Sequence, residues 1–187
     1  METKFTKNGS RYTLLVDRLL EHPPEKVWRV LTERDLLKQW FPCDVEGEWQ
    51  VGAPLRFHFL HGEGEGMSEE DLSGEVLTVD PPHLLEFRWG TGLLRAELSA
   101  EGSGCRLRFS ETLDDPSWGA RNAAGWEMCL ENLNIVLQAG TVLKFAADIW
   151  HGKYKRYAEK FEPEFGPQQG MPEGYPSESE SAGGLAQ

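Results

Sequence analysis

Apolar residues recur at alternate positions of residues 11–20, and Arg18 is the one charged residue on that side. A period of two is typical of a half-buried β-strand. After this segment the hydrophobic period lengthens to that of a helix. Pro24 suits the first helical position, and apolar residues keep helical spacing as far as Thr32. The pattern predicts a strand over 11–20, a helix from about Pro24 and a second short helix over 35–40.

Short apolar segments bounded by turn residues follow from residue 44 onward. The prolines of Asp80-Pro81-Pro82 cannot donate to a strand ladder, so this tripeptide predicts a turn between two neighbouring strands. Glu101–Gly104 predicts a tight hairpin turn, because glycine reaches positive φ without a steric penalty. Consecutive hairpins predict an antiparallel sheet. Its strands lie within 55–60, 74–89, 93–99 and 105–113.

A long amphipathic helix is predicted over 117–139, because its apolar residues fall on one side and Gly140 provides a C-terminal stop. Glu127 and Glu131 lie on the opposite side. A second amphipathic helix is predicted over 148–161. Residues 163–187 contain Pro, Gly, Ser and Glu but no Lys or Arg, which predicts a disordered acidic tail. The apolar stripe of the long helix consists of Trp126, Cys129, Leu130, Leu133, Val136 and Leu137.

The order of these elements, with strands and helices segregated along the chain, indicates an α+β fold. We expect a single domain over 1–162, in which a curved antiparallel sheet wraps around the long helix and two short helices follow the first strand. The inward side chains of such a curled sheet cannot all meet at the centre. The arrangement therefore predicts a cavity between the sheet and the helix.

Composition disfavours several classes of partner. The 187 residues carry a formal net charge of −12, whereas nucleic acids and anionic membrane surfaces attract clustered Lys and Arg. No apolar run reaches the roughly 20 residues that a membrane-spanning helix needs. Cys43, Cys105 and Cys129 show no C-x-x-C spacing, and the N-terminal residues lack the apolar core of a signal peptide. We expect a cytoplasmic protein with no nucleic-acid and no membrane partner.

Three segments give the chain a recognisable family resemblance, which covers about residues 11–162. They are RLLEHPPEKVWRVLTERDLLKQWF (18–41), GEVLTVDPPHLLEFRW (74–89) and GWEMCLENL (125–133). The sequence resembles the SRPBCC or START-like superfamily and, within it, stand-alone bacterial-type members of the family of homologues of the activator of heat-shock protein 90 ATPase. The resemblance implies a helix-grip fold with an apolar cavity between the sheet and the C-terminal helix.

Strand alternation identifies the residues that would line this cavity. Large rigid aromatic rings are typical of apolar ligand sites, although each residue alone is also compatible with an ordinary core position. Arg18 and Glu111 share the inward side and would be costly to bury without a partner, so each is expected either to form a structural bridge or to orient a ligand. The predicted wall consists of Trp40, Phe41, Phe57, Phe59, Phe87, Trp89, Leu94, Leu98, Phe109, Trp126, Leu130 and Leu133.

Catalytic and metal chemistry have little support in the sequence. There is no G-x-S-x-G elbow, and no cysteine has a neighbouring activating group. Residues 58–72 gather His and acidic side chains, but their spacing matches no established metal site, so we expect neither a metal nor another cofactor. We interpret the basic residues of the last predicted helix as a solvated face, which leaves open whether a partner or the acidic tail docks there. They are Lys153, Lys155, Arg156 and Lys160.

Three hypotheses about function follow. The first is non-enzymatic binding of a small hydrophobic or amphipathic molecule in the cavity. The second is an enzyme of the cyclase or hydrolase type known in the superfamily, in which Arg18 and Glu111 would orient a substrate or move protons. The third, which the family resemblance alone implies, is an interaction module that contacts a chaperone. Exposed aromatic residues would in addition support a homodimer.

Overall fold

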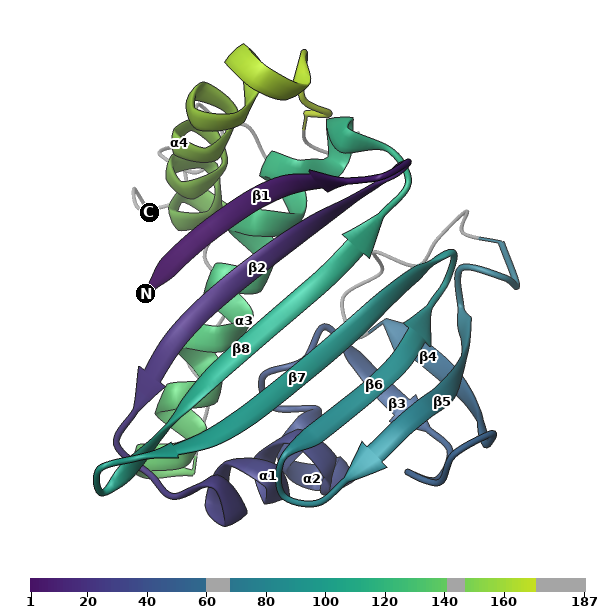
Figure 1. The fold of residues 1–187 in the computed structure, drawn as a ribbon, viewed down its shortest axis with the longest axis vertical. Coiled ribbons are helices and arrows are strands. Elements are labelled where there is room, and N and C mark those ends of the chain that lie inside the picture. The colour runs from purple at the N-terminus through teal and green to yellow at the C-terminus, as the bar shows by residue number, and fades with distance from the viewer. Residues whose placement is uncertain (60–67, 141–146, 171–187) are drawn as a thin grey trace, which may run out of the picture.

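The computed structural model describes residues 1–59, 68–140 and 147–170. Most strands are joined by short turns, and the two long helices follow the last strand (Figure 1). The strands are β1 (Glu2–Asn8), β2 (Arg11–Leu20), β3 (Cys43–Glu46), β4 (Pro54–Phe59), β5 (Ser73–Asp80), β6 (Leu84–Trp89), β7 (Gly92–Glu101) and β8 (Gly104–Leu113). The helices are α1 (Pro24–Thr32), α2 (Arg34–Leu37), a 3-10 turn (Pro116–Trp118), α3 (Gly119–Ala139) and α4 (Ala147–Phe165).

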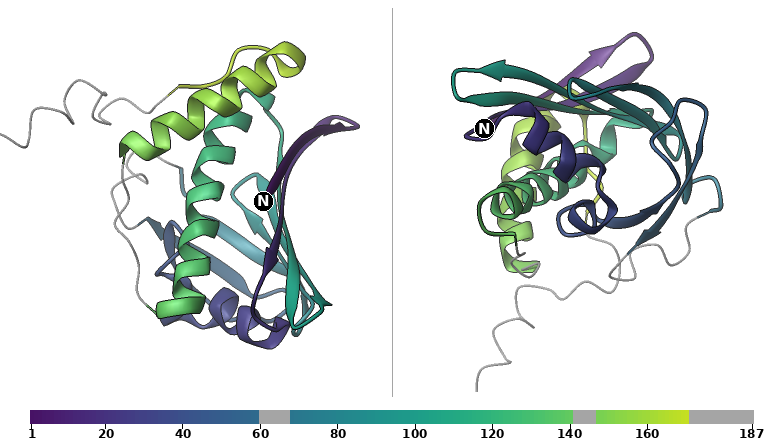
Figure 2. Two further views of the ribbon diagram at one scale, coloured as in Figure 1. Left: turned by 90° about the vertical axis from the view of Figure 1, so that its left-hand side faces the viewer. Right: turned by 90° about the horizontal axis from the view of Figure 1, so that it is seen from below.

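The eight strands form one sheet in the order β1-β2-β8-β7-β6-β5-β4-β3, and the neighbouring strands are antiparallel. The sheet curves, and α3 lies along its concave side (Figures 1 and 2). This arrangement confirms the α+β helix-grip fold, including the two short helices after β2. The α1 helix begins with Pro24, as predicted, because an N-terminal helical residue needs no backbone N–H donor.

Two glycines stop elements where the sequence predicts. Gly102, with φ of +62°, lies in the turn between β7 and β8, and Gly140, with φ of +72°, adopts the left-handed conformation that ends α3. The predicted turn at Pro81-Pro82 connects β5 to β6. The two predicted turns of the antiparallel meander are therefore confirmed.

Two strands of the sheet, β1 and β3, were not predicted. β1 (ETKFTKN) pairs with β2 along its length, yet only Thr3 and Phe5 are buried. So few apolar positions leave no recognisable alternation. The structure also corrects the second short helix, predicted over 35–40, which spans only Arg34–Leu37, and it adds the four-residue strand β3.

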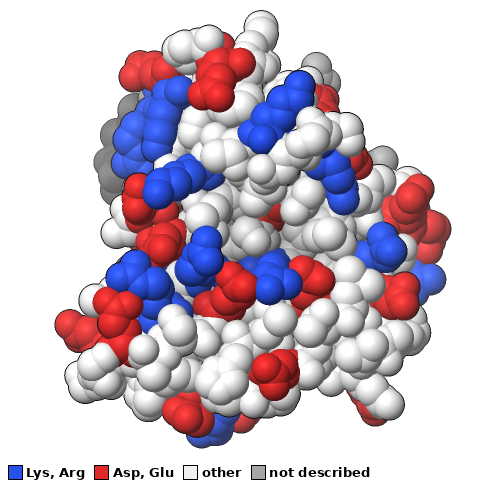
Figure 3. All heavy atoms as spheres, in the orientation of Figure 1, with Lys and Arg blue, Asp and Glu red and all other residues white. Residues whose placement is uncertain are grey.

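The convex side of the sheet is covered by charged side chains of both signs (Figure 3). Arg95 contacts Glu86 and Glu97, and Arg106 contacts Asp17 and Glu101. Pairs with this much exposure each contribute little to stability, in the range of roughly 0–1 kcal/mol.

The α4 helix crosses the N-terminal half of α3, close to β1 (Figure 2). Glu127 of α3 is only 4% exposed because side chains of α4 cover it. The prediction of a solvated helix face is therefore wrong for Lys153, whose side chain is only 11% exposed and bonds to Glu127 and Glu131. Arg156 and Lys160 are exposed as predicted, although their terminal groups also bond to α3 and β1. In the part of the chain that the structure describes, no helix is long and apolar enough to cross a membrane.

The start of the predicted tail is structured. The α4 helix extends to Phe165, whose ring packs 4.6 Å from that of Phe5. Beyond it, the Gln168 side chain accepts a hydrogen bond from the backbone of Ala120, and the Gln169 backbone donates to Ser117. The rest of the predicted tail, 171–187, lies outside the described residues.

These contacts predict different outcomes for two truncations. A chain that ends at Gly170 keeps the Phe165 and Gln168 contacts, so its melting temperature should match that of the full chain. A chain that ends at Glu164 loses both contacts, and we expect a destabilisation of about 2 kcal/mol, which for this chain length is a fall of roughly 4–8 °C. Thermal unfolding followed by circular dichroism measures both. Equal melting temperatures for the two truncations would contradict the docking of this segment.

Candidate functional site

The twelve residues predicted as a cavity wall come together on the concave side of the sheet. Ten are buried, and Phe59 and Trp89 are partly buried against the same cluster. They come from α3, from β4, β6, β7 and β8, and from the segment after α2. Whether they contact a ligand stays a prediction.

Trp126 of α3 stands at the centre of the aromatic part of this cluster. Its ring lies 4.8 Å from that of Phe109, 5.6 Å from that of Phe41 and 6.1 Å from that of Trp89. Trp89 in turn packs 4.6 Å from Phe57. Tilted and edge-on rings at such distances attract one another in addition to burying apolar surface. The rings therefore pack against one another between the sheet and α3.

The void that the described residues leave beside this cluster is small. A void of about 20 Å³ lies between the short helices and the sheet. This volume has room for about one water molecule, whereas pockets for drug-sized ligands have volumes of roughly 300–1,000 Å³. A ligand of that size would have to displace aromatic side chains of the cluster. The lining includes Leu31, Leu37, Trp40, Phe41, Ala96 and Phe109.

Glu111 is a buried carboxyl group at the edge of this aromatic cluster. It lies on the inner side of β8, opposite Leu14 of β2 and Leu94 of β7, and is 2% exposed. Trp126 Nε1 donates to Oε2 at 2.8 Å, and Asn122 Nδ2 lies 3.1 and 3.0 Å from the two carboxyl oxygens. Both donors are neutral groups on one side of α3, so the carboxyl group is hydrogen-bonded but not paired with a charge.

Burial raises the pKa of Glu111 to about 7, although the hydrogen bonds from Trp126 and Asn122 oppose this rise. Removing a carboxylate from water disfavours its charged form, and neutral donors compensate for only part of that cost. Near neutral pH the group is therefore divided between a protonated and an ionised form. It can donate a hydrogen bond in one form and accept a proton in the other.

Arg18 does not pair with Glu111, although both lie on the inner side as predicted. Arg18 is opposite Leu107 and Glu111 is opposite Leu14, so four residue steps, or roughly 13 Å, separate them along β2. Burial lowers the pKa of Arg18, while the nearby carboxylates Glu127 and Glu131 favour its charged form. Arg18 thus belongs to the neighbourhood of α4 and not to the aromatic cluster.

The sequence reading missed Asn122 as a partner of Glu111. Its position in the sequence could have identified it. Asn122 lies one helical turn before Trp126, so the Asn122 amide and the Trp126 indole N–H are on the same side of α3. An inward Glu on a strand opposite two such donors is a recognisable pattern once the helix is known to face that strand.

Other chemistries find little support among the described residues. No group of three His, Cys, Asp or Glu side chains there could hold a metal ion, while His61 and its acidic neighbours in 60–67 fall outside the described part of the chain. Cys43 and Cys105 are buried, and burial raises the pKa of Cys105 to about 11, which disfavours the reactive thiolate.

The sequence profile of one protein family matches residues 21–138, and the family is described as activator of Hsp90 ATPase homolog 1-like protein. This range covers more than half of the chain. The chain belongs to this family. The matched range includes α1, most of the sheet and nearly all of α3, but neither β1 nor α4.

Several solved structures share the fold of the chain. A conserved protein of unknown function, EF2215 from Enterococcus faecalis, is 23% identical with a TM-score of 0.69, over 87% of this chain and 91% of that one. CalU16 from Micromonospora echinospora is 18% identical with a TM-score of 0.63, over 84% and 94% of the two chains. DynU16, a putative protein in the dynemicin biosynthetic locus, is 22% identical with a TM-score of 0.59, over 71% and 49%. No curated protein matches the chain.

The raised pKa of Glu111 predicts a pH-dependent contribution to folding. Below pH 4.5 the group is protonated in both the folded and the unfolded state. As the pH rises from 4.5 to about 7, the unfolded state ionises first, so the folded state loses about 3 kcal/mol of stability through this group. Glu111→Gln removes this loss. We expect the stability of the variant relative to wild type to rise by that amount between pH 4 and pH 8, as measured by urea denaturation.

Glu48→Gln is the matched control, because Glu48 is exposed and undergoes the same chemical change. The stability of the Glu48→Gln variant relative to wild type should change much less over the same pH range. Parallel pH profiles for the two variants would show that Glu111 does not titrate near neutrality.

Proposed function

We propose that the chain binds a small apolar or amphipathic molecule between the sheet and α3, with the aromatic rings in contact with its apolar part and Glu111 with a polar group. The observation that carries this proposal is the carboxyl group of Glu111, which is buried beside an aromatic cluster and has only neutral hydrogen-bond partners. A core selected for stability alone gains nothing from such a group, because burying it costs free energy.

The chemistry of Glu111 suits a ligand with a carbonyl or hydroxyl group. The protonated carboxyl group donates to a carbonyl oxygen, and the ionised form accepts from a hydroxyl group. The interior void of about 20 Å³ does not admit such a ligand without rearrangement. Binding therefore includes a movement of side chains around Phe41 and Phe109, and the ligand shifts the population toward an open arrangement.

Catalysis by the same carboxyl group is the second candidate. A group with a pKa near the working pH is best placed for general acid–base chemistry, and Glu111 meets this condition. In that case the bound molecule is converted, and Glu111→Gln abolishes turnover while binding is retained. Chaperone contact and homodimer formation stay predictions from the sequence.

Native mass spectrometry of the purified protein, followed by solvent extraction, tests the binding proposal. We expect a stoichiometric adduct of an apolar or amphipathic small molecule that survives purification or forms when candidate lipids and aromatic polyketides are added. A protein that stays at its apo mass throughout, and that also fails to bind an apolar fluorescent probe, would contradict the proposal.

A matched pair of variants tests where the molecule binds. Ala96 of β7 lines the interior void, whereas Ala100 of the same strand is exposed. Ala96→Leu adds bulk to the interior at a cost of roughly 1–3 kcal/mol and should abolish the adduct. Ala100→Leu makes the same change outside and should leave the adduct intact. Loss of the adduct in both variants, or in neither, would contradict an interior site.

A further inference from the structure

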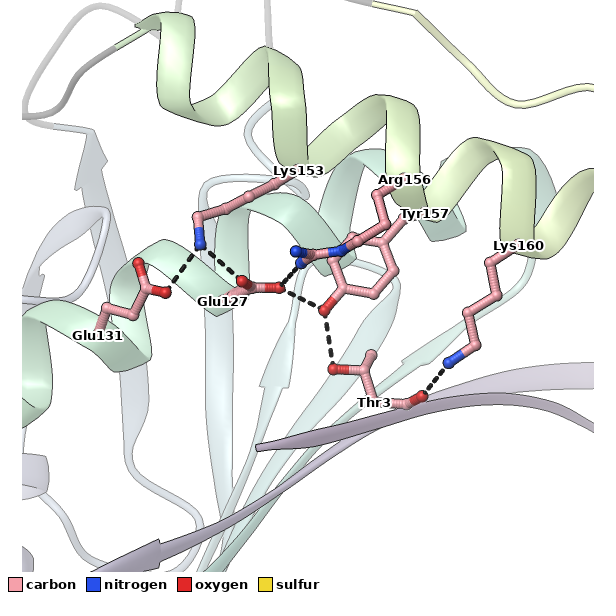
Figure 4. Close-up of polar contacts among 7 residues, drawn as sticks. All are labelled: Thr3, Glu127, Glu131, Lys153, Arg156, Tyr157 and Lys160. Carbon is pink, nitrogen blue, oxygen red and sulfur yellow. Dashed lines mark hydrogen bonds and ion pairs between the residues drawn. The ribbon is translucent and has the colours of Figure 1, made fainter.

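A second hollow lies on the other side of α3, between β1 and α4. It has a volume of about 290 Å³, and we call it the β1–α4 cleft. Figure 4 shows the polar side chains that meet there from β1, α3 and α4. The β1 and α4 elements lie outside the range that the family profile matches. The cleft is therefore built largely by segments that the shared family core does not supply. Its lining consists of Met1, Thr3, Glu127, Arg156, Tyr157 and Lys160.

Glu127 is the buried acceptor at the base of the cleft, and it is fully engaged. Lys153 Nζ donates to its Oε1 at 2.6 Å, and the Tyr157 hydroxyl donates to Oε2 at 2.5 Å. Arg156 also forms an ion pair with Oε2. Burial disfavours the charged form of Glu127, but these hydrogen bonds outweigh it and hold the pKa below its ordinary value. The carboxylate fixes the positions of the surrounding donors.

The donors continue from Glu127 to β1. Because the Tyr157 hydroxyl donates to Glu127, the Thr3 hydroxyl at 2.9 Å donates to the Tyr157 oxygen. Lys160 Nζ donates to the backbone oxygen of Thr3 at 2.7 Å. An ammonium group has three donors and a guanidinium group five. Arg156, with a side chain that is 59% exposed, and Lys160 therefore keep donor capacity at the mouth of the cleft.

Positive charge exceeds negative charge around this cleft. Its lining holds two cationic side chains, Arg156 and Lys160, and one carboxylate, Glu127, in a chain whose formal net charge is −12. The excess is therefore local and runs against the overall charge.

We propose that the β1–α4 cleft is a binding site for an oxyanion, a phosphate or carboxylate group of a small molecule, held by Arg156 and Lys160. Arg presents a planar fork that matches the oxygens of such groups, and Lys supplies a point charge one helical turn further along the same side of α4. The site lies outside the interior between sheet and α3, so it does not depend on the function proposed above.

Inorganic phosphate is the probe, and nuclear magnetic resonance of the backbone amides is the readout. Addition of phosphate to the full chain at constant ionic strength should shift the amide signals of Thr3, Tyr157 and Lys160 in a saturable manner. Lys160→Gln should weaken the affinity at least about tenfold, since a hydrogen bond to a charged group is lost. In the double variant that carries both Lys160→Gln and Arg156→Gln, phosphate should no longer shift the amide signals in a saturable manner.

Lys155→Gln is the matched control, because Lys155 is exposed on the same helix but does not line the cleft. It removes the same charge and should leave the affinity for phosphate nearly unchanged. If Lys155→Gln and Lys160→Gln weakened the affinity for phosphate equally, the effect would be one of overall charge, and the proposed site would be wrong. Signals that drift linearly without saturation in the full chain would overturn it as well.

A further experiment, with a truncated chain, distinguishes the possible sources of the oxyanion. Residues 171–187 carry glutamates and no Lys or Arg, so their carboxylates have the same chemistry as a free anion. In the chain that ends at Gly170, unchanged affinity for phosphate indicates a free small molecule as the natural occupant. Tighter phosphate binding indicates that carboxylates of this segment compete for the same cleft. No saturable binding in either chain overturns the proposal.

Discussion

The contact of Trp126 with the concave side of the sheet is the interaction on which the rest of the structure depends. Its ring contacts rings from β6, β8 and the segment after α2, so one side chain connects α3 to three parts of the fold. The same indole donates a hydrogen bond to Glu111. The packing of the helix and the position of the buried carboxyl group are therefore set by one residue, and neither can change without the other.

This double role explains how the protein tolerates a carboxyl group in its interior. Asn122 and Trp126, one helical turn apart, bring two neutral donors to Glu111 from a helix that aromatic packing already holds in place. Neutral donors reduce the cost of burial without pairing the charge, so the pKa of Glu111 rises to about 7. A cationic partner in the same position would stabilise the ionised form and remove its sensitivity near neutral pH. The aromatic interior and the unpaired carboxyl group are thus two results of one arrangement.

The helical layer outside α3 follows a different physical rule. The α4 helix is held by a buried carboxylate, Glu127, that has two cationic partners, and by the aromatic contacts of Phe161 and Phe165 with Phe5. Charged pairs of this kind specify geometry more than they stabilise, because desolvation offsets much of their attraction. Among the described residues, two buried glutamates therefore lie on opposite sides of α3, one with neutral partners and one with cationic partners.

The sequence predicted much of the fold because period and turn chemistry are local signals. The hairpin glycine Gly102, the stop at Gly140 and the stripe that contains Trp126 and Leu130 were sufficient to place the sheet around α3. β1 was missed because its burial depends on α4, which lies far away in the sequence. The inward side of Glu111 was predictable from strand parity, whereas its neutral partner Asn122 and the filling of the interior depend on how rings pack in three dimensions.

The central claim is that Glu111 is a buried carboxyl group poised near neutrality, and its own titration tests this claim most directly. Carbon-13 nuclear magnetic resonance of the side-chain carboxyl signal, assigned by its disappearance in Glu111→Gln, follows that titration. The account predicts a midpoint at about pH 7. A midpoint near the ordinary value of 4.5 would contradict it, because the carboxyl group would then be solvated or paired with a charge.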